Sequence, residues 1–163
     1  FGVLVHLAVR AGAPNLGIGV CSKGVFETLA HVRQRLGVEY GLVVHAEDGM
    51  DEISNAKPPF VAELNNGEVR TYTIQPDDFG IARANLETIR ATDSAHSLEI
   101  IKAVFNNVDG PAKDIVSLNA GAAIYAAGLT SSLADGVKKA QQVIASGSVT
   151  EKLEQLIAIT NAT

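Results

Sequence analysis

Two short apolar runs flank a helical pattern near the start of the chain. Residues 16–20 (LGIGV) and 41–45 (GLVVH) are short and largely apolar, which is typical of buried strands. Between them, residues 24–36 repeat apolar side chains at the helical period of about 3.6, and Gly37 supplies a stop. A strand, a helix and a strand joined by short links predict a parallel βαβ unit.

A second pair of strands follows. Residues 60–64 (FVAEL) and 68–74 (EVRTYTI) have the pattern of strands, and Asn65, Asn66 and Gly67 separate them. An Asn-Gly pair between two such runs is the strongest short-range signal of a β-hairpin. The antiparallel hairpin and the parallel unit together predict a mixed sheet.

The second half of the chain is helical in pattern. We expect helices over residues 97–105, from Gly110–Pro111 to about Ala127, from the capping residue Ser132 to Gly147, and from Thr150 onward. The second of these is so rich in small residues that it should pack closely on its neighbours in the middle of the domain. Because no linker and no internal repeat interrupts the pattern, we expect a single α/β domain over residues 1–163, with a helical C-terminal half.

Length and charge narrow the function classes. With 163 residues, 47% of them hydrophobic and 19% charged, the chain can build one globular domain with a real core. The net charge of −5 makes nucleic-acid binding an unfavoured function. The lysines that could form a basic patch are dispersed over the sequence: Lys102, Lys113, Lys138, Lys139 and Lys152. No apolar run reaches the roughly 18 residues of a membrane helix.

The single cysteine and the histidines offer little chemistry. Cys21 cannot form an internal disulfide, which either fits a reducing compartment or carries no information, and no nucleophile signature surrounds it. We expect a cytoplasmic location. The histidines lack the paired spacing of zinc ligands: His6, His31, His45 and His96.

Because the chain begins with Phe1 rather than methionine, we expect it to be a fragment whose front half is missing.

A glycine-rich turn precedes the first predicted helix. Residues 17–24 (GIGVCSKG) place glycines where a helix start could bind phosphate. The stretch matches neither GxGxxG nor GxxxxGK[ST], because Ser22 and Val25 stand at required positions. A plain strand-to-helix connection is the favoured interpretation.

An acidic turn follows the strand over residues 41–45. Residues 43–54 (VVHAEDGMDEIS) carry four carboxylates: Glu47, Asp48, Asp51 and Glu52. Carboxylates beyond the end of a parallel strand lie where α/β sheets bind ligands, and Mg²⁺ takes one or two of them with waters and phosphate oxygens. Gly49 would permit the tight turn. From these residues alone, a solvated surface turn with Ser54 as a cap is the favoured interpretation.

Three motifs favour the magnesium site over the solvated surface turn. The acidic turn (HAEDGMDEIS, residues 45–54), PDDFG (76–80) and LNAGAA (118–123) occur in an order and spacing that closely resemble the second half of the anthranilate phosphoribosyltransferase family. The resemblance runs from about Ala11 to the end of the chain. It implies the α/β domain of the nucleoside phosphorylase and phosphoribosyltransferase fold.

The resemblance also implies a reaction and a metal site. Family members transfer the phosphoribosyl group of phosphoribosyl diphosphate to anthranilate in tryptophan biosynthesis, and release pyrophosphate. By position, Asp51 and Glu52 correspond to the family's Mg²⁺ ligands, whereas Glu47 and Asp48 have no direct counterpart role. No catalytic residue can be carried over. A homodimer is possible for the intact protein.

The chain departs from the family in what it lacks. The Gly-Thr-Gly-Gly-Asp loop that binds phosphoribosyl diphosphate, an Asn-His-Gly segment and an arginine for anthranilate are absent, and residues 1–10 differ from the family pattern. We therefore expect the C-terminal part of a larger catalytic domain, inactive alone. Two alternatives stay open, a pyrimidine-nucleoside phosphorylase-like enzyme and a non-catalytic relative that binds nucleic acid.

Overall fold

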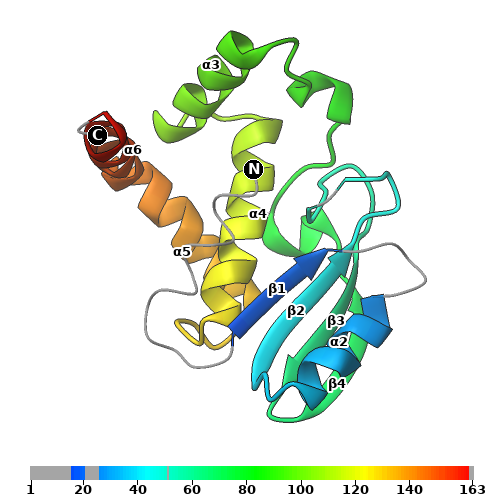
Figure 1. Ribbon diagram of the computed structural model, residues 1–163. Coiled ribbons are helices and arrows are strands. Elements are labelled where there is room, and N and C mark those ends of the chain that lie inside the picture. The colour runs from blue at the N-terminus through cyan, green and yellow to red at the C-terminus, as the bar shows by residue number, and fades with distance from the viewer. Residues whose placement is uncertain (1–15, 21–25, 51, 162–163) are drawn as a thin grey trace.

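One four-stranded sheet organises the first half of the chain. The computed structural model describes residues 16–20, 26–50 and 52–161. The strands follow the order of the chain: β1 (Leu16–Val20), β2 (Tyr40–His45), β3 (Phe60–Asn65) and β4 (Glu68–Thr73). β1 pairs in parallel with β2, whereas β2 with β3 and β3 with β4 are antiparallel (Figure 1). The predicted mixed sheet is confirmed.

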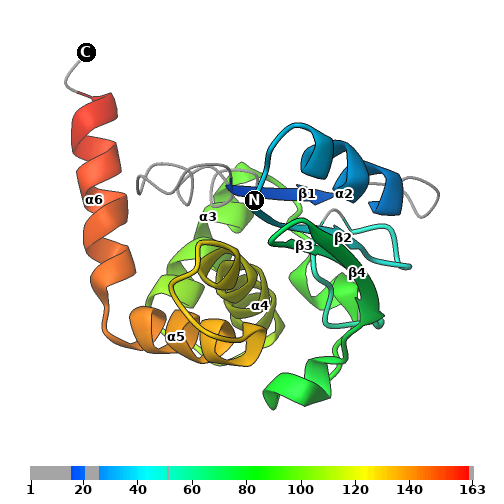
Figure 2. The same cartoon turned by 90° about the horizontal axis from the view of Figure 1, so that it is seen from below.

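Helices cover both faces of this sheet (Figure 2). α2 (Phe26–Arg35) connects β1 to β2 and places Ala30 against Val43 and Ala62 of the two central strands. The neighbouring Val44 and Val61 belong to the larger core on the opposite face. Because successive strand residues point to opposite faces, an apolar run such as that of β2 is buried on both.

The hairpin turn has the backbone that its sequence predicts. Asn66 and Gly67 have positive φ angles of 48° and 82°, as a type I′ turn requires at both central positions. β3 extends one residue beyond the predicted end and pairs Asn65 with Glu68. β4 ends at Thr73, and the prediction of this hairpin is confirmed.

Two 3₁₀ turns lead from the sheet into the helical half. These are η2 (Pro76–Phe79) and η3 (Leu86–Ile89). Four α-helices then follow in the described chain: α3 (Ser94–Phe105), α4 (Pro111–Ala126), α5 (Leu133–Ala145) and α6 (Ser148–Thr160). As predicted, Ser132 caps α5, because its hydroxyl accepts the Asp135 N–H at 3.1 Å.

Two helices begin earlier than their apolar pattern indicates. α3 starts at Ser94 rather than at residue 97, because the Asp93 carboxylate accepts the His96 N–H at 2.8 Å and caps the first turn. α6 starts at Ser148 rather than at Thr150, because Gly147 adopts a φ of 77° and turns the chain directly out of α5. A capping side chain and a glycine therefore set these boundaries.

α4 is the central helix, and it packs backbone to backbone against α5 (Figures 1 and 2). A Cβ atom on Gly121 would lie 2.5 Å from the Cα atom of Val137, and one on Gly136 would meet the carbonyl oxygen of Gly121. Side chains larger than hydrogen are therefore excluded at both positions. This contact confirms the close packing predicted for the small-residue helix.

A buried carboxylate joins the sheet to the C-terminal end of α4. Glu63 is 6% exposed and accepts hydrogen bonds from the hydroxyls of Tyr72 at 2.9 Å and Tyr125 at 2.7 Å. The Arg70 guanidinium lies 3.8 Å from the same carboxylate. Burial and the charge of Glu63 raise the pKa of Tyr72. Burial and the hydrogen bond to Glu63 raise the pKa of Tyr125 to about 12.

α6 extends away from the rest of the domain (Figure 2). It has no buried residue, and three of its apolar side chains are exposed: Leu156, Ile157 and Ile159. Across the described ranges, no helix combines the length and the apolar character needed to cross a lipid bilayer.

Replacing Gly121 by alanine should destabilise the fold, although alanine is the better helix former. The added methyl group would overlap the backbone of Val137, so α4 and α5 must separate, which should cost about 1–3 kcal/mol of unfolding free energy. Urea denaturation measures the effect. Gln142→Ala, on an exposed position of α5, is the control and should change stability by less than about 0.5 kcal/mol. Equal or greater stability of Gly121→Ala would contradict the close contact.

Removing the Tyr125 hydroxyl should lower stability by about 1–2 kcal/mol at pH 8, because Glu63 loses a buried donor. The raised pKa of Tyr125 implies a contribution that is complete below its ordinary value of 10 and lost as pH rises through about 12. Urea titrations between pH 8 and 11.5 should therefore show wild-type stability falling above pH 10 more steeply than that of Tyr125→Phe. Tyr40→Phe, at a more exposed tyrosine, is the control, and equal slopes for wild type and Tyr125→Phe would refute this linkage.

Candidate functional site

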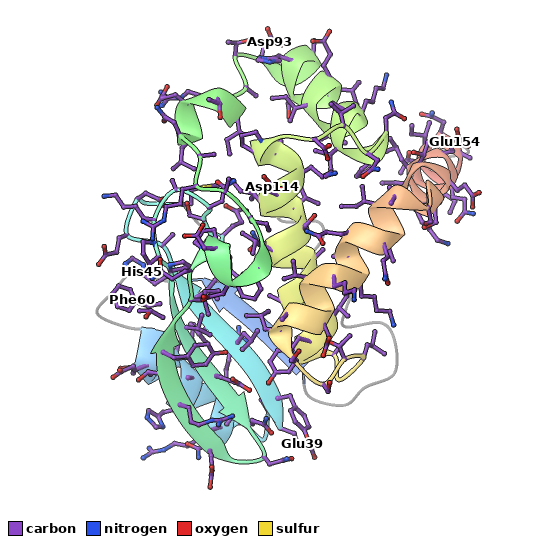
Figure 3. The ribbon with its side chains drawn as sticks, turned by 180° about the vertical axis from the view of Figure 1, so that it is seen from behind. Glu39, His45, Phe60, Asp93, Asp114 and Glu154 are labelled. Atoms are coloured by element: carbon purple, nitrogen blue, oxygen red, sulfur yellow. The ribbon has the colours of Figure 1, made fainter. Side chains whose placement is uncertain are left out.

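The acidic turn leaves the sheet where β2 ends. The ring of His45, the last residue of β2, stacks on Phe60 of β3 with 6.3 Å between ring centroids (Figure 3). Ala46 is buried, and Gly49, with a φ of 84°, donates its N–H to the Ala46 carbonyl at 3.2 Å. Because β2 is parallel to β1, the turn lies beyond the carboxyl end of the parallel pair, where α/β sheets bind ligands.

The Asp48 carboxylate closes the turn. It accepts the Met50 N–H at 3.2 Å on one oxygen and the Ser54 hydroxyl at 2.5 Å on the other. The Ser54 oxygen in turn accepts the Ala56 N–H at 2.9 Å, and Ser54 is fully buried. Ser54 thus accepts a backbone N–H as predicted for a cap, and Glu47 and Gly49 are exposed. The predicted solvated setting is wrong for Ser54 itself, because this end of the turn is packed inside the protein.

Asn119 of α4 holds the segment that follows the carboxylate pair. Its Oδ1 accepts the Ile53 N–H at 2.8 Å, and its Nδ2 donates to the Ile53 carbonyl at 3.0 Å. Nδ2 also donates to the Ile115 carbonyl of its own helix at 2.9 Å. Ile53 is 2% exposed and lies outside the sheet, so this side chain supplies the hydrogen-bond partners that a buried backbone needs.

Asn55 fastens the same loop to the start of α4. Asn55 is almost fully buried, and its Nδ2 donates to the Pro111 carbonyl at 3.4 Å. The backbone carbonyl of Asn55 accepts the Ala84 N–H at 3.2 Å. Among the described residues its Oδ1 has no partner. Asp114 lies on the same first turn of α4, where burial raises the pKa of its carboxyl. α4 therefore contacts the loop at two places along its length, at Pro111 and at Asn119.

The predicted metal ligands are only partly placed. Glu52 is half-buried and directly precedes Ile53, Glu47 is exposed, and Asp51 lies outside the described residues. The Asp51–Glu52 pair thus stays a prediction. Within the described ranges, no three His, Cys, Asp or Glu side chains come close enough to hold a metal ion. Two adjacent carboxylates on a turn nonetheless suit Mg²⁺, which needs only one or two of them beside waters and phosphate oxygens.

The remaining candidate groups do not converge. Cys21, His6 and residues 21–24 of the glycine turn lie outside the described residues. His31 is on α2, where its ring bonds Gln34, and His96 is in the first turn of α3. His31, His45 and His96 thus belong to three separate elements.

A cavity of about 300 Å³ lies at the opposite end of the sheet. It is lined by the start of β2, the end of β3 and the C-terminal end of α4, and includes Tyr40, Glu63 and Tyr125. Of the two predicted metal ligands, Glu52 is the one that the structure describes, and it does not line this cavity. The acidic turn and this cavity are separate features of the fold.

Inspection of the sequence missed the roles of Asp48 and Asn119. The sequence gives no sign that Asp48 does more than add negative charge to the turn, whereas its two hydrogen bonds show a structural role. In the sequence, Asn119 stands out only as part of the LNAGAA motif. Its amide, set among small apolar residues of a central helix, was the available signal, because buried polar side chains almost always have a partner.

Known proteins resemble this chain over nearly its whole length. Anthranilate phosphoribosyltransferase from Methylococcus capsulatus is 52% identical over 159 residues, which cover 98% of this chain and 47% of that protein. The enzyme of the same name from Dechloromonas aromatica is 45% identical over 160 residues, with the same two shares. The chain thus spans about half the length of the curated relatives it matches.

Solved structures agree with the fold. Anthranilate phosphoribosyltransferase from Thermus thermophilus superposes with a TM-score of 0.79 at 35% identity, covering 88% of this chain and 43% of that one. The Saccharomyces cerevisiae protein in complex with PRPP and Mg has a TM-score of 0.77 at 21% identity, over 91% of this chain and 43% of its own, which shows the fold alone. These matches confirm the resemblance and the phosphoribosyltransferase-type α/β fold.

A family model described as "Glycosyl transferase family, a/b domain" matches residues 7–150. That range includes the whole sheet, the acidic turn and α4. On this evidence the chain belongs to that glycosyl transferase family.

Proposed function

We propose that the complete protein containing this chain transfers the phosphoribosyl group of phosphoribosyl diphosphate to anthranilate and releases pyrophosphate. In this proposal, residues 1–163 form the C-terminal part of the catalytic α/β domain. The observation that carries it is the 52% identity to an anthranilate phosphoribosyltransferase, sustained over 98% of the chain. The activity belongs to the complete protein, because the chain spans 47% of that relative.

The proposed chemistry assigns the acidic turn to the leaving group. The bond from ribose C1 to the pyrophosphate oxygen breaks, the bond from C1 to the anthranilate nitrogen forms, and the amine loses a proton. Asp51 and Glu52 would hold Mg²⁺, which when bound neutralises the charge that develops on pyrophosphate. The position of the turn beyond the end of β2, and its attachment to α4, support this assignment.

The same proposal includes the cofactor and the partners. Structures of the yeast relative are described with Mg, with PRPP and with 4-fluoroanthranilate. We propose Mg²⁺, phosphoribosyl diphosphate and anthranilate for the complete protein, in tryptophan biosynthesis, with a cytoplasmic location and a homodimeric state. The net charge of −5 continues to disfavour a nucleic-acid partner.

The complete protein should consume anthranilate in the presence of phosphoribosyl diphosphate and Mg²⁺, which the fluorescence of anthranilate follows directly. The 163-residue chain alone should show no turnover, because the family's phosphoribosyl diphosphate loop is not in its sequence. Phosphorolysis of uridine or thymidine is the matched control reaction. Nucleoside cleavage without anthranilate consumption would point to the phosphorylase alternative, and turnover by the chain alone would contradict the division of the site.

Replacing Glu52 by glutamine in the complete protein should raise the Mg²⁺ concentration needed for half-maximal activity by about tenfold or more, because an anionic ligand becomes a neutral one. Initial rates over a Mg²⁺ titration measure this shift. Glu47→Gln removes the same charge from an exposed position of the same turn and should move the titration far less. Equal titrations for Glu52→Gln and wild type would remove Glu52 from the metal site.

A further inference from the structure

The Asn119 side chain pairs with the backbone of the acidic turn in the manner of a neighbouring strand. One amide group accepts the Ile53 N–H at 2.8 Å and donates to the Ile53 carbonyl at 3.0 Å. Two-point contacts of this kind fix orientation as well as distance, because both bonds lengthen if either partner rotates. The additional bond from Nδ2 to the Ile115 carbonyl fixes the amide against its own helix.

This pairing acts on Glu52 through the peptide bond. The N–H of Ile53 lies in the same rigid plane as the carbonyl and the Cα atom of Glu52. An acceptor that fixes this N–H therefore fixes the plane from which the Glu52 side chain departs. Because Ile53 is 2% exposed, bulk water does not compete with Asn119 as the partner of this N–H.

The other side of the turn is closed independently. Asp48 ties Met50, before the predicted ligand pair, to Ser54, after it. The bonds of Asp48 stay within the turn, whereas those of Asn119 anchor the turn to α4. α4 is a firm support, since its Leu118 and Ala122 are core residues and Gly121 touches α5 directly.

We propose that Asn119 is a positioning residue for the Glu52 carboxylate: it sets the direction from which Glu52 approaches the metal, and touches neither metal nor substrate itself. This inference rests on the proposed function, since it assumes that Glu52 binds Mg²⁺. Nothing in it requires Asn119 to titrate or to react. Its role is to preorganise the Glu52 backbone in the geometry needed for metal binding.

Metal affinity measured directly separates positioning from stability. In the complete protein with pyrophosphate, Mn²⁺ can replace Mg²⁺ as the probe, and its electron paramagnetic resonance signal reports the free ion. Asn119→Ala should raise the Mn²⁺ dissociation constant about tenfold or more, in the range seen when supporting partners of metal ligands are removed. The Mg²⁺ requirement for activity should rise in parallel, with a smaller change in kcat at saturating Mg²⁺.

Two variants of the same helix serve as controls. Tyr125→Phe also removes a hydrogen bond between α4 and another element, but at the far end of the helix, so it should lower thermal stability without changing Mn²⁺ affinity. Ser117→Ala removes a buried hydroxyl that has no partner among the described residues, and should change neither property. If Asn119→Ala resembles Tyr125→Phe in both properties, its role is purely structural and the proposal is overturned.

A near-isosteric variant guards against loss of folding. Asn119→Asp keeps the volume and the acceptor for the Ile53 N–H but loses the donor to the two carbonyls, so its Mn²⁺ affinity should also fall. Wild-type affinity in both variants, or failure of both to fold, would overturn the positioning role. If Glu52→Gln binds Mn²⁺ as tightly as wild type, Glu52 is not a metal ligand. That result would refute the proposed metal site, and it differs from the results that refute only the positioning role of Asn119.

Discussion

Two hydrogen bonds between Asn119 and Ile53 join the helical half of the chain to the loop that leaves the sheet. The physical constraint behind them is that a backbone segment buried outside a sheet or a helix must still pair its N–H and carbonyl groups. A primary amide carries a donor and an acceptor side by side, so one asparagine satisfies both groups. The path of the loop after Glu52 therefore depends on where α4 lies.

α4 in turn is located by contacts at both of its ends. At its first residue the Pro111 carbonyl binds the loop, and at mid-helix Asn119 binds it again. At the other end, the Tyr125 hydroxyl reaches Glu63 in the central strand β3. Between these ends, Gly121 allows α5 to approach until the two backbones touch. Side chains that are distant in sequence thus fix one helix across the whole length of the sheet.

The sequence predicted the features that depend on neighbouring residues. The buried runs of the strands, the turn at Asn66 and Gly67, and the Ser132 cap all follow from local pattern and backbone preference. The early starts of α3 and α6 were missed, because Asp93 and Gly147 act outside the apolar repeat. Local pattern also predicted a solvated Ser54, which is wrong, because its bond to Asp48 and its burial arise only after folding.

The same contacts distinguish the three carboxylates of the acidic turn that the structure describes. The Asp48 oxygens already accept an amide and a hydroxyl hydrogen, so coordination of a cation would break bonds that close the turn. Glu47 lies exposed next to the end of β2, on the other side of the Gly49 reversal. Glu52, by contrast, shares a peptide plane with the most firmly held residue of the loop. Three acidic residues of the described turn, Glu47, Asp48 and Glu52, therefore differ in their surroundings, and Glu52 is the one attached to a residue that α4 holds in place.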